Sequence, residues 1–181
     1  MRVISGKYKS RPIKAPNPKF TRPTTDKVKE SLFNILHNSM DFDDISVLDI
    51  YAGSGALGLE ALSRGAKHVD FVEVNFSVGK ILKSNISSLQ ADDSCKVIKA
   101  SALQYSGLRT HNSYDLIFAD PPFFKYDILE VFKNIMENDF LNESGIFIIE
   151  RSIQTKEKDA EILGEPFKQI GDSLIYWFTK N

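Results

Sequence analysis

Hydrophobic and polar residues alternate along the chain in two patterns. Short apolar runs rich in β-branched and aromatic residues are separated by stretches in which apolar residues recur every three or four positions. The first pattern indicates buried strands and the second indicates amphipathic helices. Predicted strands cover 46–50, 68–73, 96–99, 114–119 and 145–150, and predicted helices cover 26–38, 56–64, 75–89 and 128–136.

The C-terminal region departs from this alternation. Two strand-like runs, 167–170 and 173–179, are separated only by Gly171-Asp172, which is a strong signal for an antiparallel hairpin. Because strands that alternate with helices are typical of α/β proteins, we predict a doubly wound, mainly parallel seven-stranded sheet with helices on both faces. The hairpin gives this sheet an antiparallel C-terminal edge.

The N-terminal segment has a different composition. Prolines at 12, 16, 18 and 23 exclude a helix there, and residues 1–29 contain nine Lys/Arg and one acid. The segment therefore carries a net charge of +8 and the remainder −9, for a total of −1. We interpret residues 1–25 as a basic extension of a single 181-residue domain whose core is 26–181. Contact with nucleic acid is favoured over a merely solvated tail, because the cations are interleaved with turn residues.

Composition limits the remaining possibilities. The chain is 42% hydrophobic and 26% charged, has one cysteine, and lacks an apolar run near the ~20 residues that a membrane helix needs. With no signal-peptide pattern, these features predict a cytoplasmic protein that is not bound to a membrane, and we expect a monomer. The three histidines are scattered, so no metal site is predicted. The acids Glu157, Asp159 and Glu161 are expected to form a solvated face.

The most informative stretch is 47–58, Val-Leu-Asp-Ile-Tyr-Ala-Gly-Ser-Gly-Ala-Leu-Gly. It predicts a buried strand that ends near Asp49, a turn with Gly53 and Gly55, and a helix that begins at about 55. Glycines allow positive φ and the close approach of a ligand. The following helix presents free N–H groups and the positive end of its dipole. The turn therefore predicts a site for a nucleotide-like ligand, against the alternative of glycines that serve packing alone.

Two ligand types compete for this turn. Gly53, Gly55 and Gly58 fit the dinucleotide pattern G-x-G-x-x-G, and Glu73 lies 20 residues after Gly53, where a ribose-binding acid is expected. Asp49 decides between them, because its carboxylate would repel a pyrophosphate but attract the ammonium group of a methionine moiety. We therefore predict S-adenosylmethionine as the cofactor.

A second candidate site, Asp120-Pro121-Pro122-Phe123, follows the fourth predicted strand directly. The prolines stiffen the loop and keep Asp120 extended. Such a loop suits a planar base that carries an exocyclic amine. The Asp120 carboxylate and the Pro121 carbonyl can each accept one N–H while Phe123 stacks on the ring, so catalysis would depend on positioning and electrostatics. A turn that only packs Phe123 into the core is the structural alternative.

Together these residues resemble class I S-adenosylmethionine-dependent amino-methyltransferases. The segments 2–6, 22–34 and 52–64 are similar to the RsmD family, and the resemblance spans nearly the whole chain. It implies a Rossmann-like fold and methylation of the exocyclic N2 of a guanine in small-subunit (16S) ribosomal RNA. The Asp120–Phe123 loop is shared with DNA adenine enzymes, so the loop alone does not fix the base.

The resemblance also implies roles for particular residues. Catalytic contacts to the guanine are expected from Asp120, Pro121, Pro122 and Phe123. Cofactor contacts are expected from Asp49, Ala52, Gly53, Ser54, Gly55, Glu73, Ser101 and Ala102. RNA contacts are expected from the cationic and hydroxyl residues Lys7, Arg11, Arg22, Thr24, Thr25, Lys27 and Lys29. Arg22 and the two threonines could instead touch the cofactor, and the threonines could only cap a helix. Ser101 stands where relatives often have Asp or Asn, and Asn75 replaces an acid.

Three other functions stay open at this stage. A DNA adenine-N6 methyltransferase would need a base-recognition segment, for which 124–127 is too short. An NAD-dependent oxidoreductase would need a substrate domain for which 181 residues leave little room. An RNA-binding module without activity would depend on the basic extension alone.

Overall fold

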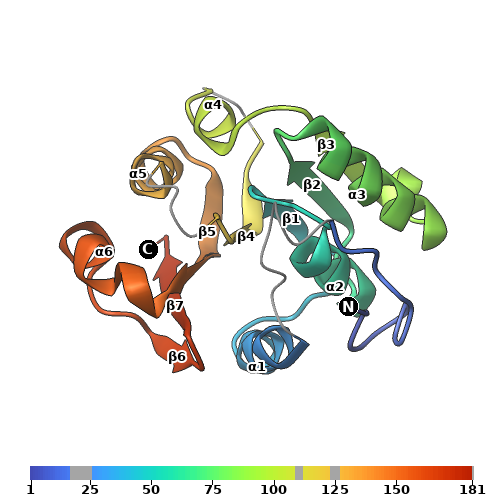
Figure 1. The fold of residues 1–181 in the computed structure, drawn as a ribbon, viewed down its shortest axis with the longest axis horizontal. Helices are drawn as coiled ribbons and strands as arrows, with labels where there is room; N and C mark the ends of the chain where they lie inside the picture. The colour runs from blue at the N-terminus through green and yellow to red at the C-terminus, as the bar shows by residue number, and fades with distance from the viewer. Residues whose placement is uncertain (17–25, 109–111, 123–126, 181) are drawn as a thin grey trace.

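The predicted fold is confirmed by a computed structural model that describes residues 1–16, 26–108, 112–122 and 127–180 (Figure 1). Seven strands form one sheet in the order β3-β2-β1-β4-β5-β7-β6. The first five strands are parallel, and β7 runs antiparallel to both β5 and β6. The strands are β1 (Ser46–Asp49), β2 (His68–Val72), β3 (Cys95–Ile98), β4 (Tyr114–Ala119), β5 (Leu141–Ser152), β6 (Lys168–Ile170) and β7 (Ser173–Thr179).

Helices cover both faces of this sheet, and each face has its own hydrophobic core. Apolar residues of α1, α2 and α3 pack on one face, and those of α4, α5 and α6 pack on the other (Figure 1). The helices are α1 (Asp26–His37), α2 (Ala56–Arg64), α3 (Phe76–Ser88), α4 (Ala102–Ser106), α5 (Ile128–Glu137) and α6 (Lys156–Leu163). No helix in these described parts of the chain is both long and apolar enough to cross a membrane.

Three elements differ from the sequence predictions. Strand β5 is longer than expected at both ends, because Leu141 pairs with Tyr114 of β4 and because β7 pairs with β5 as far as Ser152. The short helix α4 was not predicted; it is stabilised by a capping box in which Ser101 and Gln104 bond each other's backbone. Helix α6 was also missed, since its weak apolar pattern gives little periodicity.

The expectation of a solvated acidic face at 157–161 is wrong for Asp159. This carboxylate is fully buried and accepts hydrogen bonds from Arg151 Nε at 2.8 Å and from the Thr155 hydroxyl at 2.6 Å. A buried charge needs such partners, and they come from β5 and from the turn before α6. Glu157 and Glu161 are exposed, as predicted.

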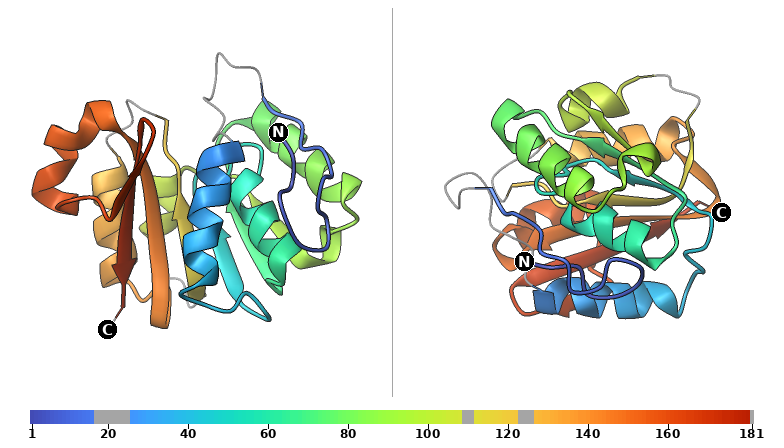
Figure 2. Two further views of the ribbon diagram at one scale, coloured as in Figure 1. Left: turned by 90° about the horizontal axis from the view of Figure 1, so that it is seen from below. Right: turned by 90° about the vertical axis from the view of Figure 1, so that its right-hand side faces the viewer.

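The N-terminal segment is part of the main core and not a detached extension. Val3 and Ile13 are buried in the cluster beneath α1 and α2, and Arg2 forms a bridge with Pro12. Gly6 has φ +81°, and a Cβ there would collide with the backbone carbonyl of Ser63 in α2. Figure 2 shows this segment lying against the same side of the molecule as α2 and α3. The close approach to α2 explains why a glycine stands at position 6.

Candidate active site

The strand order reverses next to β1, which pairs with β2 on one side and with β4 on the other. In such sheets ligands bind beyond the carboxyl ends of the strands at this switch point. Asp49 is the last residue of β1 and pairs with Phe118 of β4, two residues before Asp120. The carboxyl ends of β1 and β4 therefore deliver Asp49 and Asp120 to the same edge.

Asp49 is almost completely buried at this edge. Its side chain is 2% exposed, and one carboxylate oxygen accepts the N–H of Gly58 at 3.1 Å. The pKa of Asp49 is raised to about 7, mainly by burial and to a lesser extent by the charges of Asp120 and Glu73, while the hydrogen bond from Gly58 opposes the shift. A buried carboxyl that titrates near neutrality is suited to receive a cationic ligand group, which would stabilise its charged form.

The glycines after β1 serve different purposes. Gly53 and Gly55 have positive φ, +53° and +82°, as the turn prediction requires. A Cβ on Gly55 would lie 2.5 Å from Leu82 of α3, and one on Gly58 would collide with Phe71 of β2, so both positions are fixed by packing. Among the atoms of residues 1–16, 26–108, 112–122 and 127–180, a Cβ on Gly53 would meet only the Tyr51 carbonyl oxygen, at 3.9 Å. The turn therefore presents open space at Gly53.

Glu73 lies directly after β2 and bridges two backbone segments. One carboxylate oxygen accepts the N–H of Gly53 at 3.0 Å, and the other accepts the N–H of Asn75 at 2.7 Å. Asn75 in turn caps α3, its side-chain oxygen accepting from Ser77 and Val78. The carboxylate therefore ties the glycine turn after β1 to the start of α3.

The loop after β3 brings Ser101 and Ala102 to the next position along the edge. The Ser101 hydroxyl accepts the backbone N–H of Gln104 at 3.1 Å as the N-cap of α4, and Ala102 is buried. The Ser101 side chain thus has a structural role. A ligand contact there would come from the backbone.

The loop after β4 begins with Asp120, the acid of the second candidate site. Asp120 is partly exposed, Pro121 is buried and Pro122 is exposed. Phe123 lies outside the described residues. Asp120 follows the strand that pairs with β1, and its charge raises the pKa of Asp49.

One connection at this edge was missed by the sequence analysis. The Tyr51 hydroxyl donates to the Asp127 carboxylate at 3.0 Å, joining the turn after β1 to the N-cap of α5. Burial raises the pKa of Tyr51, so the phenol stays a donor. A tyrosine next to the polar end of a buried strand was the available signal, but its partner lies 76 residues away.

The basic residues predicted to contact RNA do not share one environment. Lys7, Arg11 and Lys27 are exposed. Arg22, Thr24 and Thr25 lie outside the described residues. The prediction for Lys29 is wrong, because its side chain is fully buried: Nζ donates to the Arg2 carbonyl at 2.5 Å and pairs with Glu60 at 3.3 Å.

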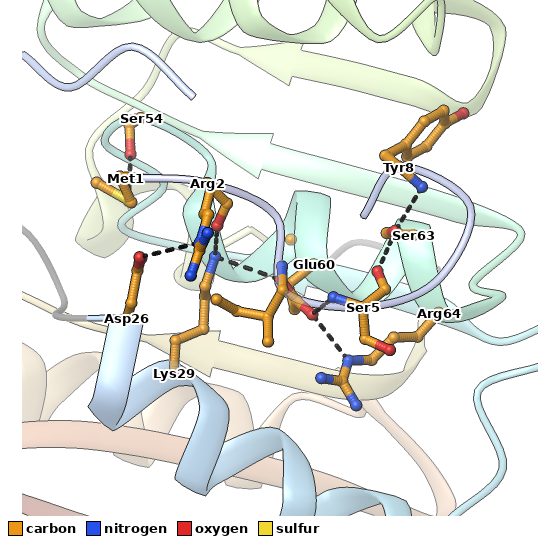
Figure 3. Close-up of polar contacts among 12 residues, drawn as sticks. Met1, Arg2, Ser5, Tyr8, Asp26, Lys29, Ser54, Glu60, Ser63 and Arg64 are labelled. Carbon is orange, nitrogen blue, oxygen red and sulfur yellow. Dashed lines mark hydrogen bonds and ion pairs between the residues drawn. The ribbon is translucent and has the colours of Figure 1, made fainter. Parts of the chain in front are cut away.

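Glu60 is the centre of this buried cluster (Figure 3). It accepts the backbone N–H groups of Ile4 and Ser5 at 2.7 and 3.1 Å and also pairs with Arg64 at 2.9 Å. Helix α2, helix α1 and the N-terminal segment are therefore joined at one carboxylate. Burial lowers the pKa of Lys29, and the charge of Glu60 opposes this shift.

Across 1–16, 26–108, 112–122 and 127–180, no three His, Cys, Asp or Glu side chains are grouped so as to hold a metal ion. The residues at the sheet edge instead offer a buried carboxyl, an open glycine backbone, and a second acid on a rigid loop. This set fits a small ligand with a cationic group and hydroxyls, next to a second ligand that donates hydrogen bonds.

Comparison with known proteins gives consistent matches. The model of the family described as "Conserved hypothetical protein 95" matches residues 1–176. YlbH of Bacillus subtilis (strain 168) is 37% identical over 167 residues, 90% of each chain. "Ribosomal RNA small subunit methyltransferase D" of Escherichia coli (strain K12) is 34% identical over 155 residues, 85% of this chain and 76% of that protein. The solved structure of yhhF from Escherichia coli superposes with a TM-score of 0.83 at 27% identity, covering 99% of this chain and 97% of that one.

Proposed function

The chain belongs to the family described as "Conserved hypothetical protein 95", the RsmD family, and on this basis we propose that it is an S-adenosylmethionine-dependent methyltransferase that modifies the exocyclic N2 amine of a guanine in small-subunit ribosomal RNA. The methyltransferase activity and the rRNA substrate follow the relatives' names. The identity of the cofactor and the N2 position of the guanine go beyond those names and are our own proposal. The family assignment favours this reading over an NAD-dependent oxidoreductase.

One observation carries the proposal. Asp49 and Asp120 leave two hydrogen-bonded parallel strands at the same edge, and the charge of Asp120 raises the pKa of Asp49. A donor site built around Asp49 and an acceptor site built around Asp120 would therefore share one boundary. Methyl transfer between two bound molecules needs this proximity.

The residues at the edge fit the cofactor. The Asp49 carboxylate would pair with the methionine ammonium, the open backbone at Gly53 would lie along the methionine part, and Glu73 would accept the ribose hydroxyls. Ala52, Ser54, Gly55 and the backbone of Ser101-Ala102 complete the proposed contacts. When bound, S-adenosylmethionine supplies a methyl group on a positively charged sulfur.

The acceptor loop would prepare the guanine amine. The N2 lone pair is normally delocalised into the ring, which makes this nitrogen a weak nucleophile. Asp120 and the Pro121 carbonyl would accept its two N–H bonds and hold the nitrogen in a pyramidal geometry, while Phe123 would stack on the base. Bound S-adenosylmethionine would supply the methyl carbon and keep the electron pair of its carbon–sulfur bond; Asp120 and the Pro121 carbonyl would orient the nitrogen, and the proton that N2 loses would leave by way of Asp120.

Methyl-transfer assays on ribosomal particles would test the proposal. The protein is incubated with methyl-labelled S-adenosylmethionine and small subunits that lack the modification, and the digested RNA is analysed by mass spectrometry. N2-methylguanosine is the expected product. A label on adenine, or no label on the RNA, would contradict the proposal.

The raised pKa of Asp49 predicts that cofactor affinity depends on pH. Only the ionised carboxylate attracts an ammonium group, and the pKa of Asp49 in the free protein is about 7. Binding should therefore release a proton at and below pH 7, and the affinity should be about fivefold lower at pH 6 than at pH 7, where the ligand's own α-ammonium group is still mostly protonated. Isothermal titration calorimetry across this range measures the effect. Asp49→Asn should bind weakly with no such pH dependence, and a wild-type profile that is flat between pH 6 and 7 would refute the assignment.

Replacement of Glu73 is expected to weaken cofactor binding and to leave the fold intact. Glu73→Ala removes both the acceptor for the ribose hydroxyls and the anchor for the Gly53 N–H, so the cofactor dissociation constant should rise by roughly a hundredfold, about 2.7 kcal/mol. Calorimetry measures this change at pH 8, and Glu161→Ala in α6 is the matched control. If Glu73→Ala bound as tightly as the control, the ribose assignment would be lost.

A further inference from the structure

Helix α3 carries an unusual combination on its exposed side. Phe76, its first residue, is 61% exposed, although large apolar side chains are normally covered. Two ammonium groups lie over this ring, Lys80 Nζ at 4.5 Å and Lys99 Nζ at 5.4 Å from its centroid. The two like charges repel each other, yet the fold holds both of them at one accessible aromatic ring.

The N-terminal segment adds two more cations along the same helix. The backbone of Lys14 exchanges two hydrogen bonds with the side chain of Asn85, and Lys14 Nζ donates to the Ser84 hydroxyl at 3.3 Å. Arg11 Nη2 donates to the carbonyl of Ser88 at 2.5 Å. Figure 2 shows the segment running beside α3. These contacts fix where the basic segment places its charges.

The spacing makes these residues a continuous stripe. Phe76, Lys80, Ser84 and Ser88 recur every four residues and therefore follow one side of the helix. Lys14 and Arg11 approach the last two of these positions. Twelve residues of helix span about 18 Å at ~1.5 Å per residue, which corresponds to about five nucleotides of a stacked strand at ~3.4 Å each.

The charge of this surface is positive. Helix α3 contains Lys80 and Lys83 and no acidic residue. At its N-terminal end the Glu73 carboxylate is engaged by two backbone N–H groups, and at its far end Asp92 accepts from Ser87 at 2.7 Å. A polyanion is therefore the complementary partner.

We propose that this stripe, defined as Phe76, Lys80, Lys99, Lys14 and Arg11, binds a single-stranded segment of the ribosomal RNA, with a base stacked on Phe76 and phosphates on the cations. Stacking on an aromatic ring beside a basic track is how proteins hold single strands without reading their sequence. The stripe begins three residues after Glu73, so bound RNA would pass close to the cofactor edge. This inference rests on the proposed function for the identity of its RNA.

Filter binding to deproteinised small-subunit rRNA tests the stripe. Phe76→Ala should weaken binding about tenfold and Phe76→Trp should restore it, because stacking needs only an aromatic face. Lys80→Gln should reduce the slope of log affinity against log salt by about one. The matched controls are Phe167→Ala and Lys168→Gln, exposed residues at the β6 edge, the opposite end of the sheet. They should bind like the parent protein.

Two further measurements separate this inference from its alternatives. Calorimetry with S-adenosylmethionine should give the same affinity for Phe76→Ala and the parent; a loss of cofactor affinity with unchanged RNA affinity would make Phe76 a cofactor contact and overturn the proposal. RNA affinities equal to those of the controls would also overturn it, even if the parent methylates rRNA. If the parent binds RNA through the stripe but transfers no methyl group, the proposed function fails and the stripe stands.

Discussion

Asp120→Ala is expected to lower the rate of methyl transfer by a hundredfold or more, while cofactor affinity stays within about twofold of the parent value. The expected loss is the usual cost of removing one preorganised hydrogen-bond partner from a reacting group. The partly exposed carboxylate lies on the acceptor side of the edge, next to the rigid Pro121, so its removal does not touch the proposed cofactor contacts. Because Asp120 raises the pKa of Asp49, the variant should also bind cofactor slightly better near pH 7.

Single-turnover transfer of a labelled methyl group measures the loss of rate, and calorimetry measures the cofactor affinity. Asp120→Asn, which keeps one acceptor but loses the charge, should fall between the parent and the alanine variant. Asp93→Ala, at an exposed position before β3, is the control and should behave like the parent. Unchanged transfer by Asp120→Ala would remove Asp120 from the mechanism.

Glu60→Ala should produce the largest loss of stability, at least about 3 kcal/mol in the free energy of unfolding. The carboxylate is fully buried, and its removal leaves the Lys29 ammonium, Arg64 and two backbone N–H groups without their acceptor (Figure 3). Removing one member of a buried ion pair costs about 3–5 kcal/mol, because the other charge stays in a low-dielectric environment.

Urea unfolding measures this loss, with Glu161→Ala as an exposed glutamate control that should stay within about 0.5 kcal/mol of the parent. The N-terminal segment should also become accessible to trypsin at Lys7 and Lys9, since Ile4 and Ser5 are held by Glu60. A change below about 1 kcal/mol would mean that the cluster does not hold the segment in place.

The fold was largely predictable because its signals are local. Apolar runs and helical periodicity identified β1 to β4, β7, α1, α2, α3 and α5 with bounds that differ by at most two residues. Helices α4 and α6 were missed, since a five-residue helix and a weakly apolar one leave almost no periodic pattern. The extent of β5 depended on its partners β4 and β7, which local sequence does not describe.

The candidate site was predictable in its parts, and the sequence could not show how the parts connect. The turn glycines and the acids at strand ends stand next to recognisable strands, and the structure brings Asp49, Glu73 and Asp120 to one edge. The sequence did not predict that Asp49 titrates near neutrality, because that shift comes from burial and from charges 24 and 71 residues away. The Tyr51–Asp127 hydrogen bond was not predicted for the same reason, because its two partners are 76 residues apart and meet only in the folded chain.

The amino-acid sequence by itself determined the alternating α/β architecture, the glycine turn after the first strand and the rigid acidic loop after the fourth, since each depends on neighbouring residues. Only the tertiary structure decided what each charge does. Composition marked Lys29 and Asp159 as surface residues, yet both side chains are fully buried and paired with Glu60 and Arg151. The physical reason is that the solvation of a charge depends on what packs around it, and those neighbours come from distant parts of the chain.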